Sequence, residues 1–199
     1  MCNAYEQHVR WIEYVRMMQE LELGIPTQQT ELDLPLSDEI RIGQMGPVMR
    51  AGVNDNEVEL APMNFGLPSD QPKRGPLFNY RSDGRKFANS RRCLIPASGF
   101  FEFTGTKYPK TKHRFTLNGA PFMAIAGIWR GAQGNHAVSF AMLTTEPGPD
   151  VAPYHDRQVV VLRPQDWGAW IGLTKPEAEL LRPLDAGSLA VETVRKGVD

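Results

Sequence analysis

The chain has 199 residues, enough for one sizeable domain with a buried core, and its composition is ordinary for a globular protein, with 41% hydrophobic residues, 23% charged residues and a net charge of −1. No apolar run approaches the roughly 18 residues of a membrane span, and the N-terminus lacks a signal-peptide pattern. With only Cys2 and Cys93, we expect no disulfide framework, a reducing cytoplasm and no membrane partner.

Residues 5–23 have the apolar periodicity of an amphipathic helix. Apolar side chains recur at helical spacing, and acidic side chains fall among the polar positions. Gly24 predicts the end of the helix, and Pro26 prevents its continuation. The pattern therefore predicts a helix over 5–23, with Cys2 on a short segment just before it.

The rest of the chain predicts short strands and turns. Strand-like apolar runs occupy residues 39–43, 46–53, 57–67, 92–104, 113–131, 137–145 and 157–162. Residues 68–90 are rich in Pro, Gly and charge and predict a long surface loop, and two short helices are expected at 164–170 and 176–181. We predict one mainly β domain over 1–199, with peripheral helices.

Positive charge is concentrated in one part of the chain. Eleven of the 22 basic residues lie between 73 and 114: Lys73, Arg74, Arg81, Arg85, Lys86, Arg91, Arg92, Lys107, Lys110, Lys112 and Arg114. Only Asp83 and Glu102 oppose them, whereas the first 60 residues are acid-rich. This asymmetry is typical of a surface that binds a polyanion such as nucleic acid. The alternative is a solvated surface that is simply rich in lysine and arginine.

Metal chemistry has no support in the sequence. There is no C-x-x-C and no H-E-x-x-H motif, and the four histidines are scattered. We therefore expect neither a metal site nor a cofactor.

Four pieces of sequence occur together in a recognisable order. They are Cys2 directly behind Met1, "FNYRS" at 78–82, "RCLIPASGFFEF" at 92–103 and "YHDRQVVVL" at 154–162. Together they resemble the SOS-response-associated peptidase (SRAP) family, whose members shield abasic sites in single-stranded DNA by crosslinking to them. The resemblance runs from residue 2 to about residue 185, and "CLIPASGFFEF" is its most specific piece.

The resemblance implies a fold and a set of roles. The fold would be a bifurcated β-sheet with a barrel-like centre surrounded by helices. The implied site consists of Cys2 as the crosslinking residue after Met1 removal, Asn79 as the group that binds its amine, Glu102 and His155 as an acid–base pair, and Arg81 and Arg85 as phosphate contacts. Single-stranded DNA containing abasic sites would be the partner, and we expect a monomer.

The chemistry of an N-terminal cysteine supports this interpretation. A terminal amine attacks an aldehyde to give a Schiff base, and the thiol of the same residue then closes a five-membered thiazolidine. Ring closure is intramolecular, for which effective molarities reach about 10⁵ M or more. An α-amine with a pKa of about 8 is readily neutral, whereas a lysine amine at about 10.4 needs strong perturbation. The alternative is that Cys2 is an accident of sequence.

Each other candidate has a structural alternative. Asn79 can orient an amine with its neutral carboxamide, or form an Asx turn. Glu102 lies in the apolar run "GFFEF", where burial raises a carboxyl pKa, or it is a partly exposed residue paired with an arginine. His155 can exchange protons near neutral pH, or serve a structural role.

Further side chains are candidates for DNA contact. Lys73, Arg74 and Lys86 would join the arginines at the phosphates. Tyr80 and Phe65 would stack against bases, although packing beneath the loop is at least as good an explanation for Phe65.

The chain departs from the family pattern at Phe65 and Phe103, where the family usually has Trp, and in the segments "MCNA", "NYRSD" and "HDRQV". Two rival functions follow from the same residues. One is an N-terminal-nucleophile thiol peptidase or amidohydrolase, which has no need of the basic region at 73–114. The other is a DNA-binding module whose crosslinking has decayed.

Overall fold

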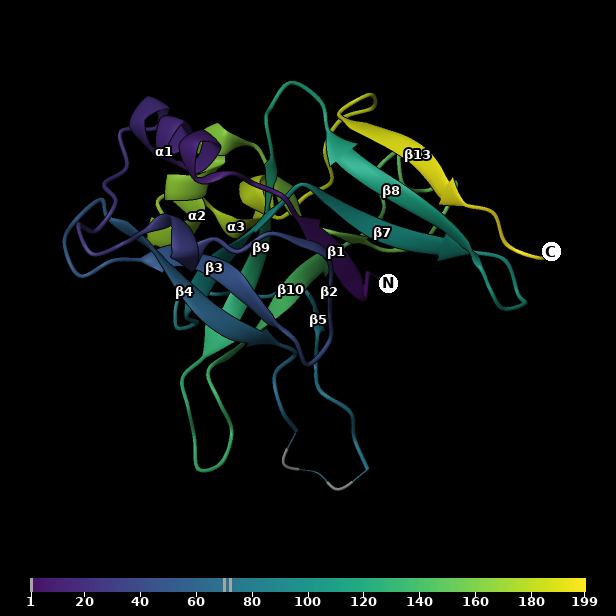
Figure 1. Ribbon diagram of the computed structural model, residues 1–199, viewed down its shortest axis with the longest axis horizontal. Helices are drawn as coiled ribbons and strands as arrows, with labels where there is room; N and C mark the ends of the chain where they lie inside the picture. The colour runs from purple at the N-terminus through teal and green to yellow at the C-terminus, as the bar shows by residue number, and fades with distance from the viewer. Residues whose placement is uncertain (1, 70, 72) are drawn as a thin grey trace.

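The computed structural model describes residues 2–69, 71 and 73–199 (Figure 1). Within them the strands are, in chain order, β1 (Ala4–Gln7), β2 (Ser37–Arg41), β3 (Met45–Ala51), β4 (Val58–Phe65), β5 (Asn79–Arg81), β6 (Arg92–Ala97), β7 (Gly99–Thr104), β8 (Thr111–Leu117), β9 (Met123–Arg130), β10 (Ser139–Thr145), β11 (Gln158–Val159), β12 (Val161–Leu162) and β13 (Leu189–Arg195). The helices are α1 (Trp11–Glu20), α2 (Trp167–Gly172) and α3 (Glu177–Leu180), with 3₁₀ turns at Glu31–Asp33 and Pro164–Asp166.

Five strands close into a ring. The order β10-β4-β3-β6-β9 returns to β10 through a second pairing, β9 with β10, and β5, β11 and β12 add to its margins. All seven residues of β10 are buried, which explains why "SFAMLTT" has no polar face. The prediction of a mainly β fold with a barrel-like centre is confirmed.

A second sheet of five strands branches from the ring, in the order β13-β8-β7-β1-β2. The run at 92–104 supplies both sheets, because β6 belongs to the ring and β7 to the second sheet. The chain passes between them at Gly99, where a Cβ atom would lie 2.9 Å from the carbonyl oxygen of Phe115. A side chain at Gly99 would therefore push β8 away from the strand that carries Glu102.

Two apolar clusters hold the sheets and helices together. One fills the ring and its junction with the second sheet, and includes Cys2 and Phe65. The other lies between the outside of the ring and the three helices, which gather on one flank in Figure 1, and includes Trp167 and Trp170. Among the described residues, no helix is both long enough and apolar enough to cross a bilayer.

The helix predicted over 5–23 is shorter than expected. Residues 4–7 form strand β1, buried at all four positions between β2 and β7, and α1 begins only at Trp11. The Arg10 backbone N–H donates to the Glu13 carboxylate at 2.9 Å, which caps the start of the helix. Cys2 therefore lies just before a strand, because pairing on both edges outweighs the local helical periodicity.

Two further elements differ from the predictions. The loop predicted over 68–90 contains β5, whose three residues pair in parallel with β10, a run too short for any periodicity. Strand β13 pairs along β8 and was not predicted, and most of its residues are exposed. The remaining predicted strands and both short helices occur near their expected positions.

Candidate active site

Cys2 is held inside the junction of the two sheets. The residue is only 1% exposed, and its thiol donates to the Ala4 carbonyl oxygen at 3.2 Å. Burial raises the pKa of the thiol to about 12, and the nearby Glu102 carboxylate adds to the shift. The side chain is thus a neutral thiol at physiological pH.

Asn79 anchors Cys2 from the ring. Strand β5 lies beside β10, and the Asn79 side-chain Nδ2 donates to the Cys2 carbonyl oxygen at 2.8 Å. The other amide atom, Oδ1, is buried and has no hydrogen-bond partner within the described ranges. Asn79 thus belongs to the Cys2 site, and the structure favours anchoring over an isolated Asx turn.

Glu102 approaches Cys2 from the second sheet. It is 1% exposed, and its carboxylate accepts a hydrogen bond from the backbone N–H of Cys2. Burial raises the pKa of Glu102 to about 7, and the negative charge of Asp156 adds to this. The carboxyl can therefore gain or lose a proton near neutral pH, beside the backbone nitrogen of Cys2.

His155 comes from the segment that follows β10. Its Nδ1 accepts from the Arg157 backbone N–H at 2.9 Å and lies 2.9 Å from an Asp156 carboxylate oxygen. Burial lowers the pKa of His155, which favours the neutral ring. When Nδ1 accepts the Arg157 N–H, the proton of the neutral ring is on Nε2.

A cavity of about 280 Å³ brings Glu102 and His155 together. Its other lining residues are Asn3, Phe103, Tyr108, Lys110 and Arg195. A second hollow of about 380 Å³ shares Asn3, Phe103 and Arg195 with it and extends to Arg41 and Lys112. The two form a groove beside Cys2 that is lined by aromatic and charged side chains, and in it Glu39 pairs with both Arg41 and Lys112. Its Arg195 comes from β13, a strand whose exposed pattern carried no chemical motif.

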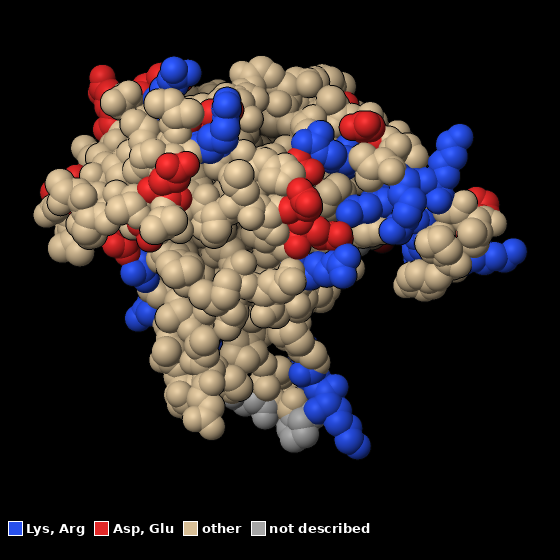
Figure 2. All heavy atoms as spheres, in the orientation of Figure 1, with Lys and Arg blue, Asp and Glu red and all other residues tan. Residues whose placement is uncertain are grey.

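The side chains predicted to contact DNA are in three situations. Some are exposed, some are exposed but paired with another side chain, and one is buried. Lys73, Arg74 and Arg81 are exposed, and Figure 2 shows basic side chains at the lower tip of the molecule and over the far ends of β7, β8 and β13. Lys86 is exposed but lies 3.6 Å from the Glu177 carboxylate. Arg85 stacks on Tyr80 at 4.8 Å and donates to its hydroxyl at 2.9 Å.

The structure contradicts the prediction that Phe65 stacks against a DNA base. The residue is 0% exposed, and its ring stacks on Phe140 at a centroid distance of 5.1 Å inside the ring of strands. It has no free face for a base. Position 65 therefore supports the fold, because it is an inward position of β4, and the packing alternative holds.

The eleven basic residues between 73 and 114 do not form one continuous surface. Arg92 turns inward and donates to the carbonyl oxygens of Trp170 and Ile171, and Arg114 pairs with Glu6. Such residues brace the fold.

Arg157 ties the His155 segment to the loop after β5. Its guanidinium pairs with the Asp83 carboxylate at 2.5 Å and donates to the Thr144 carbonyl oxygen at 2.9 Å. This pairing holds the pKa of Asp83 below its usual range. The link between the segments that carry Asn79 and His155 was not predicted, since it joins residues 74 positions apart.

No group of three or more His, Cys, Asp or Glu side chains within the described residues is arranged to hold a metal ion. Near Cys2, the Glu102 carboxyl and the His155 imidazole that shares its cavity can move protons, and the Asn79 amide can only hydrogen-bond.

Comparison with models of known protein families identifies the family of this chain. A model of the SOS response associated peptidase (SRAP) family matches residues 1–199. The chain belongs to this family. In this SRAP protein, Cys2, Asn79, Glu102 and His155 come from four separate segments, and the fold brings them to one place.

Curated relatives share part of this sequence. Abasic site processing protein YoqW of Bacillus subtilis is 32% identical over 125 residues, covering 58% of this chain and 55% of that protein. Abasic site processing protein YobE of the same organism is 31% identical over 114 residues, covering 53% of this chain and 52% of its own length. The matched stretch thus spans about half the length of these relatives.

Solved structures share the whole fold. A phage-related protein from Bordetella bronchiseptica superposes with a TM-score of 0.71 at 22% identity, covering 98% of this chain and 95% of the other. A protein from Bacteroides thetaiotaomicron gives 0.69 at 17% identity, covering 98% and 92%. At these identities the likeness concerns the SRAP fold alone.

Proposed function

We propose that this SRAP protein binds single-stranded DNA and forms a covalent crosslink with abasic sites through Cys2, after Met1 has been removed. The observation that carries the proposal is the position of Cys2 between two buried polar side chains: Asn79, which donates to its carbonyl oxygen at 2.8 Å, and Glu102, whose negative charge helps to raise the pKa of its thiol. Glu102 and His155 in turn line one cavity. The names of the YoqW and YobE relatives support abasic sites as the substrate.

The reaction would begin at the nitrogen. Hydrolysis of the Met1–Cys2 bond would free the amine, whose lone pair attacks C1′ of the open-chain abasic sugar. Loss of one water from the carbinolamine gives a Schiff base. The Cys2 sulfur then adds to the imine carbon, and the thiol proton passes to the nitrogen, so that thiazolidine formation releases only that water.

The geometry favours this order of bond formation. The Cys2 nitrogen contacts a residue of the cavity wall, whereas the thiol points to the Ala4 carbonyl oxygen and has a pKa of about 12. A neutral, buried thiol is a weak nucleophile toward an incoming substrate. Once the imine forms on the same residue, the high effective molarity of ring closure compensates for that weakness.

Glu102 and His155 would share the proton transfers. Glu102, with a pKa of about 7, would accept a proton from the attacking amine and return it to the departing hydroxyl. Neutral His155 would donate from Nε2 to the sugar oxygen during ring opening. The buried Oδ1 of Asn79 has no partner among the described residues and would accept an N–H of the freed amine.

Cations on two sides of Cys2, all exposed except the half-buried Lys110, would hold the strand. Lys73, Arg74 and Arg81 would meet phosphates on the β5 side, and Lys110 and Arg195 on the groove side. Tyr108 is 85% exposed and would offer a stacking face for a base. The DNA strand would thus run across the cavity, with phosphate contacts on both sides of it.

The thiol hydrolase alternative has weaker support. Such an enzyme needs an activated thiolate, and burial raises the pKa of Cys2 instead of lowering it. The thiol also donates to a backbone carbonyl oxygen and not to His155.

Intact-mass analysis tests the proposal, before and after incubation with an abasic single-stranded oligonucleotide. We expect a mass short by one methionine and a heat-stable adduct that is lost in Cys2→Ala. Cys93→Ala is the matched control, because Cys93 is an equally buried thiol, and it should retain the adduct. An oligonucleotide with a tetrahydrofuran in place of the abasic sugar has no aldehyde and should give none.

Retained Met1, or a processed terminus without adduct, contradicts the proposal. Unchanged affinity for intact strands would then identify a DNA-binding module, and cleavage of amide substrates that depends on Cys2 would identify the hydrolase.

A further inference from the structure

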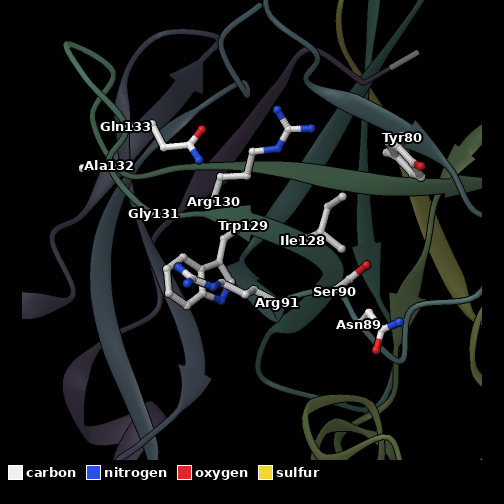
Figure 3. Close-up of a pocket in the computed structure, with 10 residues that line it drawn as sticks. All are labelled: Tyr80, Asn89, Ser90, Arg91, Ile128, Trp129, Arg130, Gly131, Ala132 and Gln133. Carbon is white, nitrogen blue, oxygen red and sulfur yellow. The ribbon is translucent and has the colours of Figure 1, made fainter.

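Apart from the two hollows of the groove beside Cys2, a separate cavity, here called the second cavity, lies where β9 ends at the margin of the ring. Its volume is about 590 Å³, within the range of about 300–1,000 Å³ typical of ligand sites. Figure 3 shows that its walls come from β5, from the turn before β6, and from the end of β9 with the loop that follows. No residue of this cavity lines the one that contains Glu102 and His155.

The second cavity carries fixed positive charge. Arg91 and Arg130 both line it, and none of its ten lining residues is acidic. Within the described residues, neither arginine pairs with a carboxylate, whereas the neighbouring Arg50 pairs with Glu59 at 2.5 Å. Two guanidinium groups without a protein counter-ion in one hollow favour an anionic ligand.

The arginines are arranged with aromatic rings. The guanidinium carbons of Arg91 and Arg50 lie 4.8 and 4.5 Å from the centroid of Trp129. A hydrogen bond from the Trp129 backbone N–H to the Arg91 carbonyl oxygen, 2.9 Å long, joins their segments. Arg91 is therefore held as a flat cationic surface over the ring, a form that stacks well against a nucleobase.

The opposite wall repeats this arrangement. Tyr80 lines the cavity, and Arg85 stacks on its ring at 4.8 Å and donates to its hydroxyl. Asn89 and Ser90 supply polar side chains between the two arginine–aromatic pairs. Cations alternating with planar surfaces are typical of sites that bind single strands without reading their sequence.

Strand β5 connects this cavity to the reactive site. Successive side chains of a strand point to opposite faces, so Asn79 reaches Cys2 while Tyr80 faces the second cavity. We propose that the second cavity binds a segment of the same DNA strand beyond the nucleotides that occupy the Cys2 site. Arg91 and Arg130 would meet its phosphates, and the stacked Arg91 and Tyr80 its bases. The identity of the strand rests on the proposed function.

Binding measurements on strands of two lengths test this inference. The variant is Arg91→Gln/Arg130→Gln, and the matched control is Arg16→Gln/Arg182→Gln, which removes the same charge from exposed positions elsewhere. The probes are single-stranded oligonucleotides of about 8 and about 30 nucleotides, chosen to cover one site or both. Each is titrated at several salt concentrations with Cys2→Ala in the background, so that no covalent product forms.

We expect the Arg91/Arg130 variant to bind the long strand about 10-fold more weakly. The slope of log affinity against log salt should become shallower by about 1.4, because two phosphate contacts are lost at about 0.7 each. The short strand should bind both variants alike. Equal affinity and equal slope for the long strand in the variant and the control would overturn the inference.

A mononucleotide and inorganic phosphate provide further probes. If either binds the unsubstituted protein and not the variant while long-strand affinity stays unchanged, the ligand is a free anion and the strand assignment is wrong. The proposed function fails in a different way. Absence of the Cys2 adduct, together with loss of long-strand binding in the variant, would remove the crosslinking proposal and leave this inference standing.

Discussion

The cavity next to Cys2 and the second cavity are built from different kinds of side chain. The one next to Cys2 contains Glu102 and His155, both titratable, with pKa values shifted by burial. The other contains the guanidinium groups of Arg91 and Arg130 and no acidic side chain. A carboxyl or an imidazole exchanges protons and burial shifts its pKa, whereas a guanidinium acts as a fixed charge. The first cavity therefore suits chemistry and the second suits binding.

Two neighbouring residues of strand β5 face the two sites, one the Cys2 site and the other the second cavity. Asn79 is buried and bonded to Cys2, whereas the next residue, Tyr80, is half-buried and stacks with Arg85. If the comparison is right, substitutions on the two sides should change different measurements. Rates of adduct formation should respond on one side, and salt-dependent affinity on the other.

The largest expected effect is on the reaction rate. Glu102→Gln should slow adduct formation by about 10²–10⁴-fold, because the amide cannot exchange the protons of the carbinolamine step. Affinity for an intact strand should stay unchanged. Single-turnover rates measured by gel shift of the adduct test this, with Glu192→Gln on β13 as the matched control. A rate within twofold of the unsubstituted protein would exclude Glu102 from proton transfer.

The raised pKa of Glu102 predicts that the stability of the fold depends on pH. Its pKa is about 4.5 for the free group and about 7 in the fold, so the folded state holds the proton more tightly. The stability it contributes is fully present below about pH 4.5 and is lost as the pH rises through about 7, a change of about 3 kcal/mol. Urea unfolding of Glu102→Gln should lack this loss. Parallel pH profiles of both proteins would contradict the shifted pKa.

Core positions should change stability without changing either function. Phe65→Ala should lower the free energy of unfolding by about 3–5 kcal/mol, because it empties a site packed against Phe140. Below the unfolding transition, the remaining folded protein should bind DNA with unchanged affinity. Tyr80→Ala is the informative partner, since it should weaken long-strand binding instead. A specific loss of affinity in Phe65→Ala would restore the stacking role first predicted for it.

A smaller loss is expected at Asn79. Asn79→Leu removes the donor to the Cys2 carbonyl oxygen, which should cost about 1–3 kcal/mol of stability by leaving a buried acceptor unpaired. Adduct formation should slow by about 10-fold as the reacting nitrogen loses its fixed position. Asn79→Asp keeps the shape but adds charge, and should stabilise a protonated amine. Its rate optimum should therefore move to higher pH.

The sequence predicted the general fold well. Alternating or continuous apolar runs identified most strands, and prolines at first turns marked α2 and α3. It failed where tertiary pairing decides the structure: β1 forms because two strands flank it, although its residues continue the helical periodicity of α1. Strand β5 is three residues long, and no local pattern can reveal an element of that length.

The candidate site was predictable in its residue types but not in its surroundings. The position of Cys2 and the apolar run around Glu102 carried chemical information on their own. The Arg157–Asp83 pair and the position of Arg195 depend on segments far apart in the chain, which only the closed ring and the second sheet bring together. The Arg91–Trp129 contact is likewise invisible in sequence, because its partners lie 38 positions apart and neither lies in a known motif.

The finest test of the comparison uses two arginines on opposite sides of β5. Arg81 follows Asn79 by two residues, so strand alternation places it on the Cys2 side, whereas Arg91 lines the second cavity. Arg81→Gln should weaken binding of a short abasic strand about threefold to 10-fold, the effect of one lost phosphate contact, and Arg91→Gln should leave it unchanged. Long strands should respond to both. Since the net charge changes equally in the two variants, a general loss of attraction predicts identical titrations for the short strand. Divergence between them is therefore the measurement that separates two sites on one strand from a single diffuse basic surface.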